Sequence, residues 1–308
     1  MTNTSILRAL PPLALAACSA GGFGTLAPTS SAVAGIHTQQ STQPLVYISQ
    51  QADNSIRVFR LDGKRIGRIT QRVNYPQGLF ADANGTLYVA NRGAHNVLEF
   101  KRGATSPFKS LSDGKEQPEG VTLCPDGTVY VANILGSHGG GGDIAVYGHG
   151  STHPTGTLNY SGGFFFFLAC DAQGNLFGSM VLGSTGTVIE FPGAQQSGAT
   201  LLPIAWGGNP AGIAIDKSGN LLAADQGEGV EEFTESGQPT GLQIATGGVN
   251  EIALSANGKL LLGSTSKGAV QYTFPGGVLD HTYLSRGTPI GAAFDPGGKD
   301  RAIASEPL

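Results

Sequence analysis

Carboxylate, amide and aromatic side chains stand at equivalent places of an internal repeat, and they are the residues of this chain that could bind a ligand. One set occupies the middle of a Pro-x-Gly segment, and the other ends a strand-like segment that follows it. Carboxylate and amide oxygens can hold a cation or a polar partner, whereas an aromatic ring offers an apolar contact. We expect the ligand-binding residues to be Gln77, Asn91, Glu119, Asn133, Phe166, Asp225 and Asn250.

The Pro-x-Gly set is chemically uneven. Its members are one carboxylate, two amides and three apolar residues: Glu119, Gln77, Asn250, Phe166, Ala211 and Ile290. A hard cation usually needs several oxygen ligands and more than one carboxylate. We therefore favour a site without a metal or other cofactor. For the Phe164 to Phe167 run we favour core or channel lining over a platform for a ligand.

No motif identifies catalytic residues. The chain lacks the Gly-x-Ser-x-Gly segment that would supply a serine nucleophile, and its histidines follow no known metal-ligand spacing. The catalytic residues stay unknown, and we favour a protein that is not an enzyme.

Repeats of about 40 residues must position the candidate residues. The clearest copies are Pro76–Asn91, Pro118–Asn133 and Pro210–Asp225, and weaker copies run from Phe165, Val249 and Pro289. Turn glycines at positions 85, 127, 174, 219 and 258 are separated by 42, 47, 45 and 39 residues, the length of one propeller blade. Each copy consists of short apolar runs separated by Gly, Asn, Asp and Pro, which predicts antiparallel strands joined by turns.

The two ends of the repeat region are expected to join. Leu45 to Ser49 already matches a second strand, so the first copy lacks its innermost strand, whereas Ile290 to Asp295 supplies an extra one. Pairing between these segments would close the ring and remove its exposed edges. Arg301 to Ser305 also resembles a second strand, so seven blades remain a less favoured alternative to six.

The Pro76–Asn91 and Pro118–Asn133 copies, with third strands such as Ala94–Phe100, resemble the NHL-repeat propellers from about residue 45 to residue 308. This resemblance implies an all-β, six-bladed β-propeller of four-stranded antiparallel blades. The Pro-x-Gly segments and the loops after the second strands should open on one face, where any site should lie.

The same copies are similar to the gluconolactonase and senescence-marker family, whose propellers hold a divalent metal at the channel mouth. That resemblance implies an alternative function as a metal-dependent lactonase or hydrolase. In this alternative Glu119 and Asn250 would be ligands of one divalent cation such as Ca²⁺ or Zn²⁺.

The N-terminus is predicted to direct export. Arg8 precedes the short apolar segment Ala9–Ala17, and Leu15 to Cys18 resembles a bacterial lipobox, in which the cysteine receives a lipid. We expect a signal peptide over residues 1–17, a lipid-anchor cysteine and flexible tether over 18–43, and the propeller over 44–308. An ordinary cleavable secretion signal is the alternative. Ser19 after the cysteine would favour the outer membrane in a host with two membranes, so the expected location is the bacterial cell envelope.

Two further cysteines, Cys124 and Cys170, could pair in an exported domain. The repeat alignment places them one register apart in neighbouring blades, so their side chains should point to opposite faces of their strands. We therefore expect two separate buried cysteines rather than a disulfide.

Composition limits the partners. A net charge of −4 with scattered Lys and Arg gives no basic patch for nucleic acid, and 308 residues with 48 glycines suit one turn-rich β domain. We expect a binding or scaffold module for a protein, peptide or carbohydrate partner, attached to the membrane through a lipid at Cys18.

Overall fold

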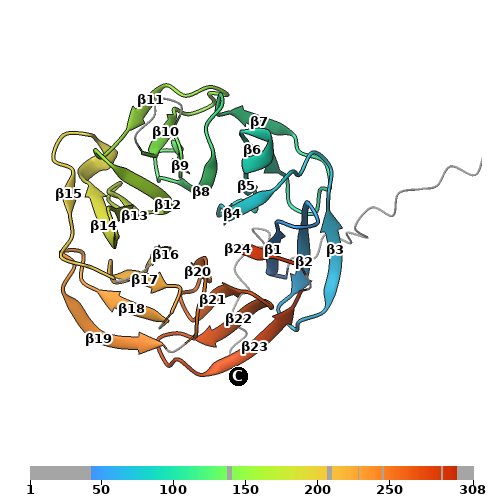
Figure 1. Cartoon of the computed structure of the whole chain (residues 1–308). Helices are drawn as coiled ribbons and strands as arrows, with labels where there is room; N and C mark the ends of the chain where they lie inside the picture. Colours follow the sequence, from blue (N-terminus) through green and yellow to red (C-terminus); the bar gives the residue numbers. More distant parts are fainter. Residues whose placement is uncertain are drawn as a thin grey trace, which may run out of the picture. The chain divides into compact units, whose positions relative to one another are not determined.

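Six four-stranded antiparallel sheets form a ring in the computed structural model, so the domain is a six-bladed β-propeller (Figure 1). A cavity lined by the inner strand of every sheet lies at the centre of the ring, and we call this central region the channel. The structure describes residues 43–136, 141–206, 210–227, 229–244, 246–285 and 287–296. The predicted signal peptide, Cys18 and nearly all of the tether lie outside these residues, as does the possible extra strand at 301–305. Within the described part of the chain, no helix has the length and apolarity to cross a membrane.

The blades follow one another along the chain. The first three contain β24 (Pro289–Asp295), β1 (Leu45–Gln50), β2 (Ser55–Arg60) and β3 (Arg65–Ile69); β4 (Pro76–Ala81), β5 (Leu87–Asn91), β6 (Asn96–Phe100) and β7 (Lys109–Ser112); and β8 (Pro118–Leu123), β9 (Val129–Asn133), β10 (Asp143–Tyr147) and β11 (Gly156–Leu158). The last three contain β12 (Gly163–Cys170), β13 (Leu176–Leu182), β14 (Thr185–Phe191) and β15 (Thr200–Leu201); β16 (Pro210–Ile215), β17 (Leu221–Asp225), β18 (Val230–Phe233) and β19 (Pro239–Ile244); and β20 (Ile252–Leu254), β21 (Leu260–Thr265), β22 (Gly268–Thr273) and β23 (Leu279–Leu284). Two 3₁₀ turns, η1 (Arg92–Ala94) and η2 (Pro192–Ala194), follow β5 and β14.

The ring closes as predicted. The C-terminal strand β24 pairs antiparallel with β1, with Leu45 opposite Asp295 and Ile48 opposite Ala292. The red β24 lies beside the blue β1 in Figure 1. Blade 1 therefore takes its inner strand from the end of the repeat region, and the described residues form six sheets rather than seven.

The two faces of the ring differ in the way predicted. Pro76 pairs with Asn91, Pro118 with Asn133 and Pro210 with Asp225, so each inner strand begins beside the end of the second strand. We call this side the mouth face. The opposite side, the turn face, carries the Asp-x-x-Gly turns. In one example, Asp82 Oδ1 accepts the backbone amides of Asn84 and Thr86, both at 2.8 Å. Gly85, which lies between them, adopts a φ of 80°.

The core lies between neighbouring blades, because each sheet is covered on both sides. All five residues of β5 are buried, and so are all five of β9. Between blades 2 and 3 the buried cluster includes Val97, Leu111, Val131 and Tyr147. Such double coverage explains the nearly continuous apolar runs of the second strands.

Glycine is required where inner strands converge. A Cβ atom on Gly120 would lie 2.4 Å from the carbonyl oxygen of Phe166, and one on Gly212 would lie 2.3 Å from the amide nitrogen of Ile252. The Pro-x-Gly signature therefore reflects close approach of adjacent blades at the mouth face.

The expectation of two separate cysteines is wrong. Cys124 and Cys170 form a disulfide with a Cα–Cα distance of 5.3 Å. The alternation argument failed because Cys124 lies in the turn after β8, where strand alternation no longer sets the direction of a side chain. Cys170 ends β12, the inner strand of the next blade, so the bond joins blades 3 and 4.

Candidate functional site: a polar cluster at the channel mouth

An ion pair joins blades 2 and 3 at the mouth face. Arg92 opens η1 directly after β5, and Glu119 is the second residue of β8. The Arg92 Nη1 atom lies 3.0 Å from the Glu119 Oε2 atom. Gln117 Oε1 accepts the Nε and Nη2 hydrogens of the same guanidinium at 3.1 and 2.7 Å. The guanidinium is thus held in one plane by partners from the next blade.

Burial changes the acidity of Glu119. Only 7% of this residue is exposed, and desolvation raises its pKa from an ordinary 4.5 to about 7, against the opposing positive charge of Arg92. The carboxyl group therefore gains and loses a proton near neutral pH. Protonation weakens its attraction for Arg92.

The hydrogen-bonding groups of this cluster that are not used within it are mainly donors. Arg92 uses three of its five N–H groups on Glu119 and Gln117, and its side chain stays 26% exposed. Gln77, at the start of β4, is buried, and its Nε2 has no acceptor among the described residues. Gln117 Oε1 and Glu119 Oε2 already accept from Arg92, and the remaining N–H groups of the guanidinium suit a partner group that accepts hydrogen bonds.

Glu251 lies deeper in the channel, and our sequence analysis missed it. It stands in the sixth blade at the place where other copies have the glycine of Pro-x-Gly. Its carboxylate accepts the amide of Leu79 at 3.0 and 3.2 Å and that of Ala292 at 2.7 Å. A Cβ atom on Gly78 or Gly291 would lie 2.9 Å from its oxygens. An acid in place of a repeat glycine was the signal that could have revealed it.

Glu251 connects three blades around the channel. Burial raises its pKa well above the usual range, while the hydrogen bonds from Leu79 and Ala292 oppose this shift. Beyond it, a cavity of about 230 Å³ is lined by residues of all six inner strands, and the side chains of Leu79, Phe167 and Ile213 form part of its wall. Glu251 is a carboxylate in the same wall.

The structure places four of the predicted site residues around the mouth of the channel. Gln77 and Glu119 come from neighbouring inner strands, and Phe166 is half-buried in the bulge of β12. Asn250 precedes β20 and donates from Nδ2 to the carbonyl of Pro289 at 3.2 Å. In the Phe164 to Phe167 run, Phe165 and Phe167 are buried, as favoured for core or channel lining.

The other three predicted residues hold loops in place. Asn91 is fully buried, accepts the amide of Asn74 at 2.6 Å and donates to the carbonyl of Arg72 at 3.1 Å. Asn133 Nδ2 donates to Asp143 and Glu116 at 2.9 and 2.7 Å. Asp225 accepts the amide of Gly227 at 2.7 Å. Their polar groups therefore bind the loops next to the ends of the second strands.

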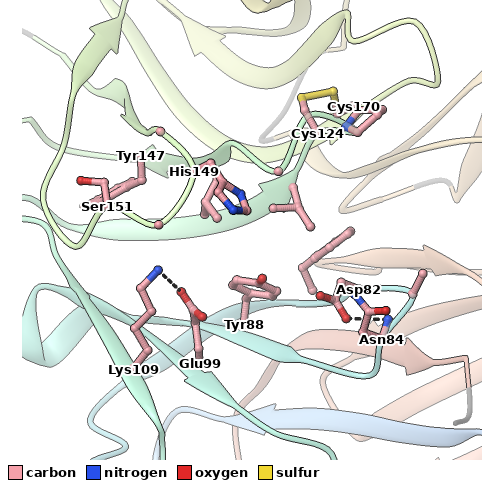
Figure 2. Close-up of a pocket in the computed structure, with 18 of the residues that line it drawn as sticks. Asp82, Asn84, Tyr88, Glu99, Lys109, Cys124, Tyr147, His149, Ser151 and Cys170 are labelled. Carbon is pink, nitrogen blue, oxygen red and sulfur yellow. Dashed lines mark hydrogen bonds and ion pairs between the residues drawn. A yellow bond between two sulfur atoms is a disulfide. The ribbon is translucent and has the colours of Figure 1, made fainter.

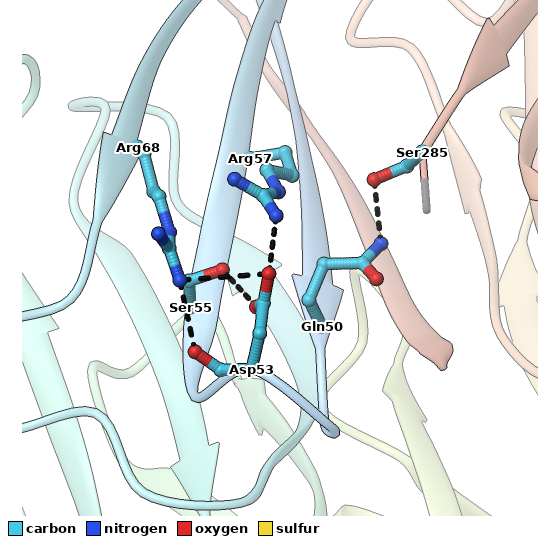
Figure 3. A network of polar contacts seen from close by, with 6 residues as sticks. All are labelled: Gln50, Asp53, Ser55, Arg57, Arg68 and Ser285. Carbon is cyan, nitrogen blue, oxygen red and sulfur yellow. Dashed lines mark hydrogen bonds and ion pairs between the residues drawn. The ribbon is translucent and has the colours of Figure 1, made fainter. Parts of the chain in front are cut away.

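A second polar network holds the closing seam at the end of β1 (Figure 3). Asp53 accepts hydrogen bonds from Ser55 and Arg57, and Arg68 donates to its carbonyl oxygen at 3.0 Å. Gln50 Nε2 donates to Ser285 Oγ at 2.7 Å and so links blades 1 and 6. This network positions a loop.

The residues at the mouth do not fit a site for a divalent cation. The Glu119 carboxylate is paired with Arg92, whose charge opposes a metal ion, and the Asn250 amide is engaged by Pro289 and by Gln226 at 3.5 Å. Among the residues that the structure covers, no group of three or more His, Cys, Asp and Glu side chains could hold a metal. We derive no metal-dependent step from this geometry.

Comparison with known proteins gives a likeness of fold. No protein-family model matches the chain. A stretch of 203 residues is 26% identical to the human E3 ubiquitin-protein ligase TRIM32, covering 59% of this chain but 30% of that protein. The chain thus spans less than a third of this relative.

Among solved structures, a chain of a nidogen/laminin complex matches with a TM-score of 0.64 and 14% identity over 82% of this chain and 98% of its own. A protein of unknown function from Bacteroides caccae matches with a TM-score of 0.60 and 13% identity, over 82% and 99%. A virginiamycin B lyase from Staphylococcus aureus matches with a TM-score of 0.52 and 17% identity, over 80% and 86%.

The fold is shared by all three. One of these structures is a chain of a nidogen/laminin complex and another is a lyase. Fold alone does not choose between binding and catalysis, so a function must be inferred from the side chains at the mouth.

Proposed function

We propose that this chain is an exported binding propeller whose mouth face takes a protein or peptide partner through an acidic group. The observation that carries the proposal is the guanidinium of Arg92, held between Gln117 and Glu119 with part of its surface open. A carboxylate of the partner would accept the remaining N–H groups of Arg92. Arginine is well suited to this role, because its planar fork matches a carboxylate.

The arrangement favours recognition over hydrolysis. Glu119 is paired, Glu251 is buried against backbone amides, and among the described residues neither carboxylate belongs to a group of three or more possible metal ligands. The alternatives are a carbohydrate partner without acidic groups and a lactone cleaved with Ca²⁺ or Zn²⁺, and binding and hydrolysis assays distinguish them from an acidic partner.

Export is supported by the disulfide between Cys124 and Cys170, since such bonds persist mainly in oxidising compartments. We propose a lipid at Cys18 that holds the propeller at the bacterial cell envelope. Mass spectrometry of the N-terminal peptide from detergent-extracted protein should show a lipidated Cys18, and Cys18→Ala should leave the membrane fraction. An unmodified Cys18 in mature membrane-bound protein would contradict the anchor.

The binding proposal can be tested with the full chain and four probes: immobilised acidic, uncharged and basic peptides, and a neutral oligosaccharide. We expect the acidic peptide to be retained and Arg92→Ala to weaken its binding by about tenfold or more. Arg60→Ala is the matched control, since Arg60 is an exposed arginine at the end of β2 on the turn face. Retention of basic peptide alone, or lactone hydrolysis that needs a metal and is lost in Glu119→Gln, would refute the proposal.

A further inference from the structure

A groove of about 700 Å³ lies between blades 2 and 3 at the turn face, away from the mouth cluster (Figure 2). This volume falls within the range of sites for small ligands. In Figure 2, Lys109, Glu99, Tyr88 and Asp82 form one side of the groove, while Tyr147, Ser151 and His149 form the other.

The register of blade 2 builds one wall. Phe80 of β4 lies opposite Tyr88 of β5, Tyr88 opposite Glu99 of β6, and Glu99 opposite Lys109 of β7. Directly paired residues point to the same face of a sheet, so an aromatic pair and an ion pair line the groove in one row. The rings of Phe80 and Tyr88 have centroids 6.1 Å apart.

Blade 3 supplies the facing wall. Leu123, Val129 and Tyr147 are paired across β8, β9 and β10, and they give this side an apolar surface. The Cys124–Cys170 disulfide lines the same groove. At the rim Phe108 leaves half of its surface, 50%, in solvent.

The row holds hydrogen-bonding capacity that the described residues do not use. Glu99 is buried, and its Oε1 lies 3.3 Å from Lys109 Nζ, its ion-pair partner. Lys109 has three donors, and the Tyr88 hydroxyl can both donate and accept. Desolvation raises the pKa of Glu99, which agrees with its burial.

The two turn aspartates at the groove are occupied. Asp82 accepts the amides of Asn84 and Thr86, and Asp171 accepts those of Gln173 and Asn175. Glu99 and Lys109 are the oppositely charged pair within the wall, while Asp82 and Asp171 keep their negative charges at its edge. An anion would meet these carboxylates and a cation would meet Lys109, whereas a neutral polar ligand avoids both repulsions.

We propose that this groove binds a neutral saccharide of one or two sugar rings. A sugar hydroxyl both donates and accepts, so neighbouring hydroxyls can serve Glu99, Tyr88 and Lys109 together. The C–H face of a sugar ring is apolar and packs on an aromatic side chain such as Phe108. A ligand with charge of only one sign, or a ligand without polar groups, would not match both the aromatic pair and the ion pair of this wall.

The test uses the full chain with cellobiose, maltose and chitobiose as probes, and with glucuronic acid and glucosamine as charged comparators. Saturation-transfer NMR and isothermal titration should show binding of a neutral disaccharide at millimolar concentration. Phe108→Ala and Glu99→Gln should each weaken it by about fivefold to tenfold.

Matched controls separate this groove from other sites. Glu190 occupies the equivalent cross-strand place in blade 4, between Phe177 and Thr200, so Glu190→Gln should leave binding unchanged. Arg92→Ala should also leave it unchanged, whatever its effect on an acidic peptide at the mouth. If Glu99→Gln fails to fold, the Phe108→Ala variant tests the proposal alone, because Phe108 is half exposed and its replacement should leave the fold intact. Absence of binding, binding of charged comparators alone, or binding that survives Phe108→Ala would overturn the proposal.

Discussion

The carboxylate of Glu251 in the sixth blade accepts a hydrogen bond from the backbone amide of Leu79, a residue 172 positions earlier in the second blade. The same carboxylate accepts the amide of Ala292 in β24. One side chain therefore satisfies backbone donors from two other blades inside the channel. Buried amides without acceptors are costly, so this contact should matter for stability.

Replacing Glu251 with Ala should lower the free energy of unfolding by about 3 kcal/mol, because the amides of Leu79 and Ala292 lose their acceptor. Urea titration measures the loss. Glu251→Gln keeps one acceptor oxygen and should cost less. Glu235→Ala, at an exposed turn residue, is the control and should change little. Equal stability of Glu251→Ala and wild type would show that the contact is unimportant.

Substitution of Gly120 by Ala should destabilise the ring by at least about 2 kcal/mol, because the new methyl group would lie 2.4 Å from the carbonyl oxygen of Phe166. Gly156→Ala is the matched control, since its Cβ would be 4.0 Å from the nearest side-chain atom. Thermal denaturation compares the two. Similar melting temperatures would mean that the inner strands do not approach as closely as described.

The Cys124–Cys170 disulfide closes a loop across 46 positions and should contribute about 2–4 kcal/mol. The double variant Cys124→Ser, Cys170→Ser should melt at a lower temperature, and a reductant should lower the melting temperature of wild type but not of this variant. Thiol titration of denatured, unreduced protein should detect Cys18 at most. Free thiols at all three cysteines would contradict the bond.

Stability should fall as the pH rises through neutrality. Desolvation raises the pKa of Glu119 from 4.5 to about 7 and that of Asp113 from 3.8 to about 7. A group with a raised folded-state pKa stabilises the protein fully below its unfolded value and loses this contribution as the pH rises through the folded value.

The pH dependence can be assigned by substitution. Between about pH 4.5 and pH 7.5 each carboxyl should remove roughly 3 kcal/mol, so Glu119→Gln should show a smaller decline than wild type in urea titrations over this range. Asp113→Asn, which alters the partner of the Tyr147 hydroxyl, should reduce the decline independently. Identical pH profiles for wild type and Glu119→Gln would contradict a raised pKa.

The fold could be predicted because its signals are local and repeated. Asp82 and Gly85 encode a turn within five residues, and Asp216 and Gly219 repeat the same pattern in the fifth blade. The pairing of β24 with β1 could also be predicted, because the first copy of the repeat lacks its inner strand and the last copy supplies an extra one. The chemistry at the mouth could not be predicted in the same way, because Arg92 meets Glu119 across a blade boundary. The pairing of Cys124 with Cys170 also depends on how two blades converge, and no periodicity along the chain records that distance.

The most direct measurement of the proposed function is the affinity of an acidic peptide for wild type and for Glu119→Gln, determined by isothermal titration from pH 6 to pH 8. The negative charge of Glu119 repels an acidic group bound beside it at Arg92, so its neutralisation should strengthen binding by about threefold to tenfold at pH 8. Wild-type binding should also tighten as the pH falls through about 7, where Glu119 gains a proton. Weaker binding in Glu119→Gln, with no dependence on pH in wild type, would contradict recognition of an acidic group by Arg92.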